Sequence, residues 1–244
     1  KENKNNLIIN FGCRLNFWEG NIIKNNLELS GASNLTIVNT CAVTSEASKH
    51  ALKTIRKTHN NNNNNKIIVT GCGVEADYKK FSSLKQVYRI IKNRDKLKYD
   101  FKEEKNLSKN KLLDDNLSLN INSNKKISPA NSHYRRYVRI QTGCDHQCTF
   151  CIIPKCRGSS ISTPIDVITK EIKKLTDIGI KEIILTGVDL TSWGKDLKVK
   201  FSLGHLIKKI LQSNSKILRL RLSSLDAAEI DNETLNVIKE EKRL

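Results

Sequence analysis

Short apolar segments rich in β-branched residues alternate with helical segments along most of this 244-residue chain. In the first hundred residues the apolar segments lie at 7–11, 35–38, 66–70 and 87–91, and the main helical ones at 16–29 and 44–58. Strands joined by helices of this length run parallel, because each crossover returns the chain to the same end of the sheet. The sequence therefore predicts an α/β fold in which helices cover the faces of a parallel sheet.

A second series of strands and helices follows a change in composition. Residues 101–132 lack periodicity and are dominated by Lys, Asn, Ser and Asp, as is typical of a linker. Beyond it, strands are predicted at 137–141, 182–186 and 217–222, and helices at 164–177, 203–211 and 228–239. We expect an N-terminal domain over 1–101, a linker over 102–132 and a second domain over 133–244. Its three βα units are either half of a βα barrel or a small complete sheet.

The charge and the chain ends carry further expectations. Lys and Arg number 43 against 25 Asp and Glu, a net charge of +18 that fits a polyanion such as RNA. A Lys-, Asn- and Ile-rich composition is equally typical of an AT-rich genome, so charge alone leaves both explanations open. No apolar run could span a membrane and none follows the start as a signal, so we expect a cytoplasmic protein. The sequence lacks methionine and stops without a terminating pattern, which indicates a fragment.

Three cysteines form a compact motif in the second domain. Cys144, Cys148 and Cys151 are spaced C-x3-C-x2-C, so that one loop can give three thiolates to an iron–sulfur cubane and leave its fourth iron open. Zinc needs a fourth ligand, and the local candidate, His146, stands in a cramped position between two of the cysteines. The spacing favours an iron–sulfur cluster, with zinc as the alternative.

Three further cysteines each follow an apolar strand of the first domain. Cys13, Cys41 and Cys72 come two or three residues after strands 7–11, 35–38 and 66–70. The carboxyl ends of parallel strands share one edge of a sheet, so we expect the three thiols to converge there. The alternative is three separate buried cysteines, a common use of the free residue. Cys156 is interpreted as a small packed residue, with an adventitious thiol as the minor alternative.

Together these residues resemble the methylthiotransferase branch of the radical S-adenosylmethionine enzymes. The loop from Cys144 to Cys151 and the Arg157-Gly158 pair look like the radical-cluster segment, although Lys155 and Cys156 depart from the family pattern. The N-terminal cysteines are similar to those of the auxiliary-cluster domain. Residues 186–194 and 221–224 look most like the subgroup that acts on threonylcarbamoyladenosine in tRNA.

The resemblance implies a fold, an activity and a set of partners. The fold is an N-terminal parallel-sheet methylthiotransferase domain followed by the first half of a radical-SAM (β/α)6 partial barrel. The activity is transfer of a methylthio group to C2 of N6-threonylcarbamoyladenosine beside the tRNA anticodon. It implies two [4Fe–4S] clusters, an auxiliary one on Cys13, Cys41 and Cys72 and a radical one on the loop cysteines, with S-adenosylmethionine as the cofactor. It further implies tRNA, a reductant such as a flavodoxin or ferredoxin, a monomer, and a missing C-terminal part without which the fragment is inactive.

Single residues are assigned around these clusters. Phe150 is expected to pack against the adenosine of S-adenosylmethionine, or else to be a core aromatic beneath the loop. Gly187 ends a strand where the methionine moiety would need a close approach of the backbone. For RNA the candidates are Arg157, beside the cluster loop, and Arg135 and Arg136, which alternate with tyrosines, although a solvated strand explains the last two as well.

Other functions remain open at this stage. The same chemistry could act on isopentenyladenosine in tRNA or on a ribosomal protein aspartate. A two-cluster electron carrier is a non-enzymatic alternative, but carriers usually close each cluster with a fourth cysteine, which neither trio has nearby. A zinc-based RNA-binding module is a further one, which metal analysis would separate.

Overall fold

A computed structural model describes residues 6–105 and 135–244 of the chain. Its contacts divide these residues into two units. The first contains residues 6–105 together with Phe150–Arg157, and the second contains 135–149 and 158–244. Residues 150–157 therefore group with the first unit, although they lie inside the second domain as the sequence divides it. Most of the predicted linker lies outside the described residues.

A four-stranded parallel sheet forms the first unit, as the sequence predicts. Its order is β1-β2-β3-β4, and the register pairs Val38 with Val69 and Ile9 with Val38. The strands are β1 Leu7–Asn10, β2 Leu35–Thr40, β3 Lys66–Gly71 and β4 Val87–Ile90. The central strands β2 and β3 are buried almost throughout, which is typical of a parallel sheet covered on both faces.

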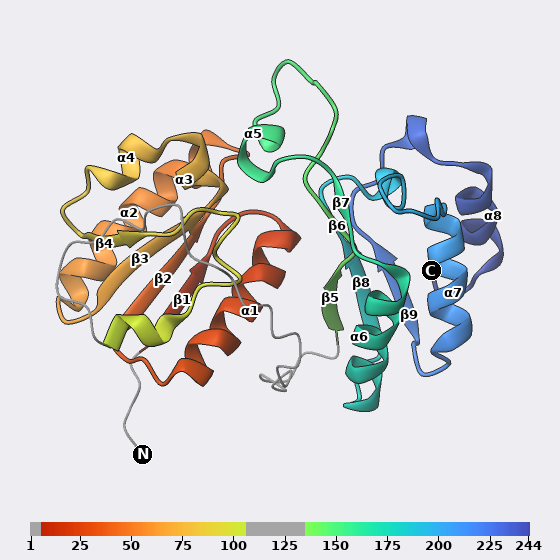
Figure 1. The fold of residues 1–244 in the computed structure, drawn as a ribbon, viewed down its shortest axis with the longest axis horizontal. Coiled ribbons are helices and arrows are strands. Elements are labelled where there is room, and N and C mark those ends of the chain that lie inside the picture. The colour runs from red at the N-terminus through yellow and green to blue at the C-terminus, as the bar shows by residue number, and fades with distance from the viewer. Residues whose placement is uncertain (1–5, 106–134) are drawn as a thin grey trace. The chain divides into compact units, whose positions relative to one another are not determined.

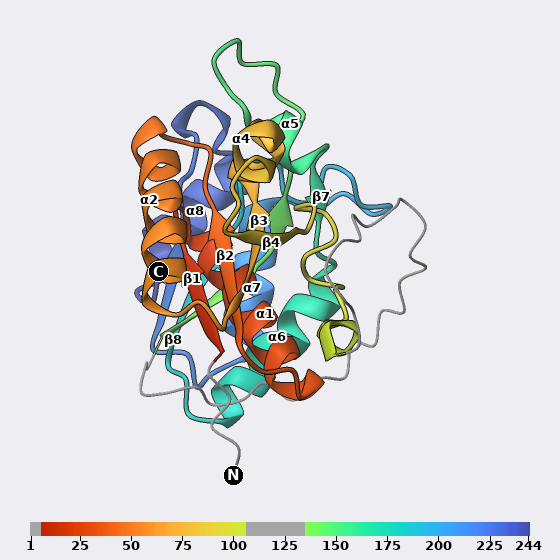
Figure 2. The ribbon, with the colours of Figure 1, turned by 90° about the vertical axis from the view of Figure 1, so that its left-hand side faces the viewer.

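Helices cover both faces of this sheet (Figures 1 and 2). The helices of this unit are α1 Arg14–Ser30, α2 Ser45–Asn61, α3 Cys72–Ala76, α4 Tyr78–Ser82, the 3-10 helix η1 Phe101–Lys105 and α5 Ile153–Arg157, of which α5 packs on α3. One core joins α1 and η1 to the sheet, and the other joins α2, α3 and α4 to it. Successive side chains of a strand point to opposite faces, so Ile37 packs in the first core and Val38 in the second.

The C-terminal end of helix α2 and the position of Phe101 differ from the sequence expectations. Helix α2 begins as predicted, with the Thr44 hydroxyl accepting from the amide of Ala47, but it continues to Asn61. Phe101, assigned to the edge of the linker, is instead buried, with its ring packed edge-on against Tyr99 at a centroid distance of 5.0 Å. A large aromatic side chain such as that of Phe101 gains enough from burial to pack in the core even where the surrounding sequence is polar.

The second unit holds a three-stranded parallel sheet in the order β5-β8-β9. Its elements are β5 Arg135–Arg139, α6 Ile165–Asp177, β8 Glu182–Thr186, η2 Leu190–Ser192, α7 Leu203–Ser213, β9 Arg219–Leu222, η3 Ala227–Glu229 and α8 Asn232–Glu240. Helix α6 packs on β5 and α7, and α7 packs on α8 (Figure 1). No helix in the described parts of the chain is long and apolar enough to cross a membrane.

The first strand of this unit ends two residues earlier than predicted. The expected strand 137–141 divides at Ile140, after which β6 Gln141–Thr142 leaves the sheet and pairs antiparallel with β7 Ile161–Ser162. Residues 143–160, which contain the cysteine loop, are thus enclosed by a two-residue ladder. Strands this short have no periodicity that a sequence could show.

Candidate metal centres

Three cysteines lie at the carboxyl edge of the first sheet, after β1, β2 and β3. Cys13 precedes α1, Cys41 follows β2, and Cys72 is the first residue of α3. Burial raises the pKa of Cys41, and negative charge on Cys13 and Cys72 raises it further. The three cysteines therefore lie along one edge of the sheet, although their sulfurs do not all lie within 4.8 Å of one another.

Gly12 leaves space beside the sulfur of Cys41. Its φ is +92°, and a Cβ atom at this position would stand 2.4 Å from Cys41 Sγ. A side chain is thus disfavoured both by the backbone conformation and by the sulfur. The amide of Val43 approaches the same sulfur at 3.4 Å. Three cysteine sulfurs, with only a glycine backbone beside one of them, are ligands that fit an iron–sulfur cluster held by three cysteines.

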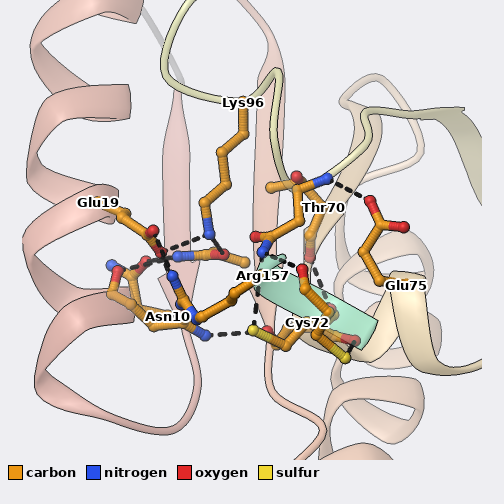
Figure 3. Close-up of polar contacts among 12 residues, drawn as sticks. Asn10, Glu19, Thr70, Cys72, Glu75, Lys96 and Arg157 are labelled. Atoms are coloured by element: carbon orange, nitrogen blue, oxygen red, sulfur yellow. Dashed lines mark hydrogen bonds and ion pairs between the residues drawn. The ribbon is translucent and has the colours of Figure 1, made fainter. Parts of the chain in front are cut away.

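A buried charged triad lies beside these cysteines (Figure 3). Arg157 of α5 contacts both carboxylate oxygens of Glu19 in α1, at 2.7 and 3.1 Å. Lys96, from the loop after β4, contacts Glu19 Oε2 at 2.5 Å. The side chains of Glu19, Lys96 and Arg157 are only 5, 1 and 2% exposed. Each charge is therefore compensated within the protein rather than by water.

Two asparagines complete the hydrogen bonding of this triad. Arg157 Nη2 donates to Asn16 Oδ1 at 2.7 Å, and Lys96 Nζ donates to Asn39 Oδ1 at 3.2 Å. Burial would raise the pKa of Glu19, but Lys96 and Arg157 outweigh it and hold the pKa below its usual value. With two cations and one carboxylate, the ionised triad has a net charge of +1. Such a charge favours the thiolate of Cys72, whose pKa Arg157 and Lys96 help to lower.

Cys156 lies against Cys72 within the same site. Its thiol donates to the Cys72 carbonyl oxygen at 3.3 Å. When Cys72 is ionised, its thiolate is the stronger acceptor for that single proton. This interaction between the two side chains, opposed by burial and assisted by Arg157 and Lys96, lowers the pKa of Cys72 to about 6. The same interaction, together with burial, raises the pKa of Cys156. The packed position predicted for Cys156 is confirmed by its 5% exposure, but its neighbour is a candidate ligand.

The burial of Arg157 contradicts its assignment to RNA. Its guanidinium is directed at Glu19 and Asn16 inside the first unit, and ion pairing in the interior leaves it inaccessible to a phosphate. The other two RNA candidates lie on β5, where Arg135 is exposed and Arg136 is partly exposed. The Arg136 guanidinium donates to the carbonyl of Arg135 at 3.3 Å.

In the second unit, Gln141 fixes the start of the cysteine loop. Its Nε2 donates to the Gly143 carbonyl at 2.7 Å, and its Oε1 accepts from the amides of Val188 and Asp189 at 2.9 and 3.0 Å. The amide of Cys144 donates to the Gly158 carbonyl at 3.1 Å. One buried amide side chain thus joins the loop that begins at Cys144 to the loop that follows β8.

His146 is directed toward carboxylates of the same unit. Its Nε2 lies 3.1 Å from Asp189 Oδ2 and 3.2 Å from Glu229 Oε1, and Cys144 is close to it and to Asp189. Burial would raise the pKa of Asp189, but hydrogen bonds from Ser192 and Thr191 and the contact with His146 hold it below its usual value. The carboxylates of Asp189 and Glu229 could therefore bind a cationic group of a ligand near Cys144.

The remaining predicted residues differ in their surroundings. Phe150 is 91% exposed, so the core alternative is wrong and the ring is free to contact a ligand. A Cβ atom on Gly187 would lie 2.9 Å from Leu190 Cδ2 and 3.0 Å from Gln141 Oε1. The side chains of Leu190 and Gln141 therefore pack directly against the backbone of Gly187. Of the loop cysteines, Cys148 is exposed and Cys151 partly exposed.

The sequence interpretation did not identify Glu19, Lys96 or Gln141. Glu19 did carry a signal, because Leu15, Glu19, Ile23 and Leu27 occur at four-residue intervals along one face of α1, and all four are buried. A carboxylate on an apolar helix face needs a cationic partner. That partner was not identifiable, because Arg157 lies 138 residues away along the chain.

Comparisons with known proteins match two separate regions of the chain. The first region, residues 5–92, matches the family described as Uncharacterized protein family UPF0004, and residues 138–240 match the Radical SAM superfamily. The threonylcarbamoyladenosine tRNA methylthiotransferase MtaB of Rickettsia prowazekii is 42% identical over 99% of this chain and 58% of its own length.

Two further relatives extend this likeness. The ribosomal protein uS12 methylthiotransferase RimO of Carboxydothermus hydrogenoformans is 34% identical, and the MtaB protein of Thermotoga maritima is 30% identical. The chain is covered to 97 and 96%, and the relatives to 56 and 55%. The chain thus spans a little over half the length of the curated relatives it matches. With both regions present in this order, the chain belongs to the methylthiotransferase family of radical S-adenosylmethionine proteins.

Proposed function

We propose that the protein to which this chain belongs transfers a methylthio group to C2 of N6-threonylcarbamoyladenosine in tRNA. The observation that carries the proposal is that Cys13, Cys41 and Cys72 each follow one of three neighbouring parallel strands, at the same edge of the sheet, in a chain that also has the loop motif of Cys144, Cys148 and Cys151. The likeness to the MtaB proteins, which are named for this tRNA substrate, supports the choice of acceptor.

Each cysteine set is proposed to hold one [4Fe–4S] cluster. When reduced, the cluster of the loop supplies the electron that cleaves S-adenosylmethionine. Around it, Asp189 and Glu229 offer negative charge to the cofactor's ammonium group, Gly187 allows a close backbone approach, and Phe150 covers the adenosine. In the first unit, Arg157 and Lys96 offset the negative charge of the thiolates of the auxiliary site.

The partners follow from this chemistry. Arg135 and Arg136 on β5 remain our proposed contacts to tRNA phosphates, which cationic side chains bind without reading sequence. A reductant such as a flavodoxin or ferredoxin supplies electrons, and the protein acts as a monomer in the cytoplasm. The RimO relative favours a second candidate acceptor, an aspartate of a ribosomal protein.

Iron analysis tests the two-cluster proposal. After anaerobic reconstitution we expect about 8 irons and 8 acid-labile sulfides per chain, because two cubanes contain four of each. Replacing Cys13, Cys41 and Cys72 together with alanine should leave about 4 irons. The matched control replaces Cys144, Cys148 and Cys151 and should also leave about 4, now on the auxiliary site. About 4 irons that persist after the first triple replacement, or zinc without iron, would contradict the proposal.

The acceptor is tested with the full-length protein. With S-adenosylmethionine and a reductant, it should methylthiolate tRNA that contains threonylcarbamoyladenosine, as seen by mass spectrometry of the digested nucleosides. Transcripts with isopentenyladenosine or unmodified adenosine serve as controls. Modification of a ribosomal protein aspartate in place of the nucleoside would move the assignment to the second candidate.

A further inference from the structure

The proposed auxiliary site contains a fourth thiol that is not among its three ligands. Cys156 is separated from Cys72 by 84 residues of sequence, yet its thiol donates to the carbonyl oxygen of Cys72 at 3.3 Å. Both residues are buried, at 5 and 3% exposure, so water does not compete for this contact. Helix α5 packs on α3, which begins at Cys72. The contact is therefore fixed by two packed helices.

The side chain of Asn93 donates a hydrogen bond to the sulfur of Cys72. Its Nδ2 lies 3.8 Å from Cys72 Sγ and 2.9 Å from the carbonyl oxygen of Cys156. The backbone amide of Asn93 donates to Glu75 Oε1 of α3 at 2.7 Å, which holds Asn93 against that helix. The side-chain amide thus connects α5 to the Cys72 sulfur and has little freedom to turn away.

A metal-bound Cys72 has no proton, so its sulfur can only accept hydrogen bonds. The side-chain amide of Asn93 already donates to this sulfur, and the thiol proton of Cys156, which reaches the carbonyl oxygen of the same residue, can turn to the charged thiolate. Such donors stabilise the additional negative charge of a reduced cluster and thereby raise its reduction potential. We propose that Cys156 and Asn93 are positioning residues that raise the reduction potential of the auxiliary cluster through hydrogen bonds to Cys72 Sγ. The inference rests on the proposed auxiliary cluster.

Redox titration of the auxiliary cluster tests this role. In a chain whose Cys144, Cys148 and Cys151 are replaced by alanine, one cluster remains, and its reduction is followed by EPR. We expect Cys156→Ala to shift the midpoint to a lower potential, because one donor is lost. Cys156→Ser retains a hydroxyl donor and should give a smaller shift. Ser48→Ala is the matched control, since that hydroxyl donates to the Cys41 carbonyl and not to a sulfur, and it should leave the midpoint unchanged.

The possible outcomes separate the inference from the function on which it rests. An unchanged midpoint in Cys156→Ala, with about 4 irons still bound in that background, overturns the inference and leaves the auxiliary cluster in place. Loss of iron in Cys156→Ala also overturns it, because Cys156 would then be a ligand and not a donor to one. Absence of iron from the chain with intact Cys13, Cys41 and Cys72 overturns the auxiliary cluster itself.

Discussion

Replacing Glu19 with glutamine should lower the free energy of unfolding of the first unit by about 3–5 kcal/mol, the usual cost of removing one partner from a buried ion pair. The substitution leaves Lys96 and Arg157 close together in the interior without a compensating carboxylate. The amide of glutamine can accept a hydrogen bond from one of them but cannot neutralise either. Urea unfolding followed by Trp18 fluorescence, in a Trp193→Phe background, measures the effect in the unit that contains α1.

Glu28 supplies the matched control on the same helix. Its carboxylate lies 4.0 Å from Lys24, and both side chains are about half exposed. Exposed pairs of this kind contribute about 0–1 kcal/mol, so Glu28→Gln should change the stability by no more than that. If Glu19→Gln has an equally small effect, the triad does not hold the unit together.

The effect of Glu19 should also depend on pH. Its pKa is lowered in the folded protein, so its ionised form stabilises the fold above the pKa of the unfolded chain. This stability is lost as the pH falls from about 4.5 through the lower pKa of the folded state. The difference in stability between wild type and Glu19→Gln should therefore narrow in acid. A difference that stays constant down to pH 3 would contradict this account.

Gly143→Ala should destabilise the second unit and prevent the cysteine loop from binding iron. Gly143 has φ +75°, and a Cβ atom there would stand 1.8 Å from the carbonyl oxygen of Ser159, a backbone atom that cannot turn aside. The left-handed conformation costs a non-glycine residue about 1–2 kcal/mol, and the steric conflict adds about 1–3 kcal/mol. Because Cys144 is the next residue, the displaced backbone also moves the first of the three proposed ligands in the loop.

Gly158 separates these two contributions. Its φ of +74° is nearly the same, but nothing lies within 4 Å of a Cβ atom built on it. Gly158→Ala should therefore show only the conformational cost and keep its full iron content. Unfolding followed by Trp193 fluorescence in a Trp18→Phe background, together with iron analysis, compares the two variants. Equal stability and equal iron content in both would show that the contact with Ser159 is relieved without consequence.

The periodic parts of the fold were predictable from the sequence, and the contacts between distant segments were not. Strands β1 to β4 and β8 follow apolar runs, and helices α1, α2, α6 and α7 follow helical spacing, because burial on a sheet imposes those patterns. The short helices α3 and α4 and the two-residue strands β6 and β7 are below the length at which a pattern can be recognised.

The candidate site divides in the same way. The placement of Cys13, Cys41 and Cys72 at one sheet edge was predictable, because a parallel sheet places the ends of its strands together whatever the side-chain details. The triad was not predictable, since the pairing of Glu19 with Arg157 depends on which residues of a distant loop pack beneath the sheet edge. Arg157 was accordingly assigned to RNA from its charge, whereas its burial places it in the interior.

The grouping of residues 150–157 with the first unit has a consequence for the order in which the protein is made. Proteins are synthesised from the N-terminus, and an N-terminal domain usually folds before the next is complete. Here the sheet β1-β2-β3-β4 leaves the ribosome long before Arg157, which neutralises Glu19. The nascent first unit therefore carries one incompletely paired carboxylate and an uncovered Cys72 until α5 emerges. Its final packing waits for a segment encoded well beyond its own last strand.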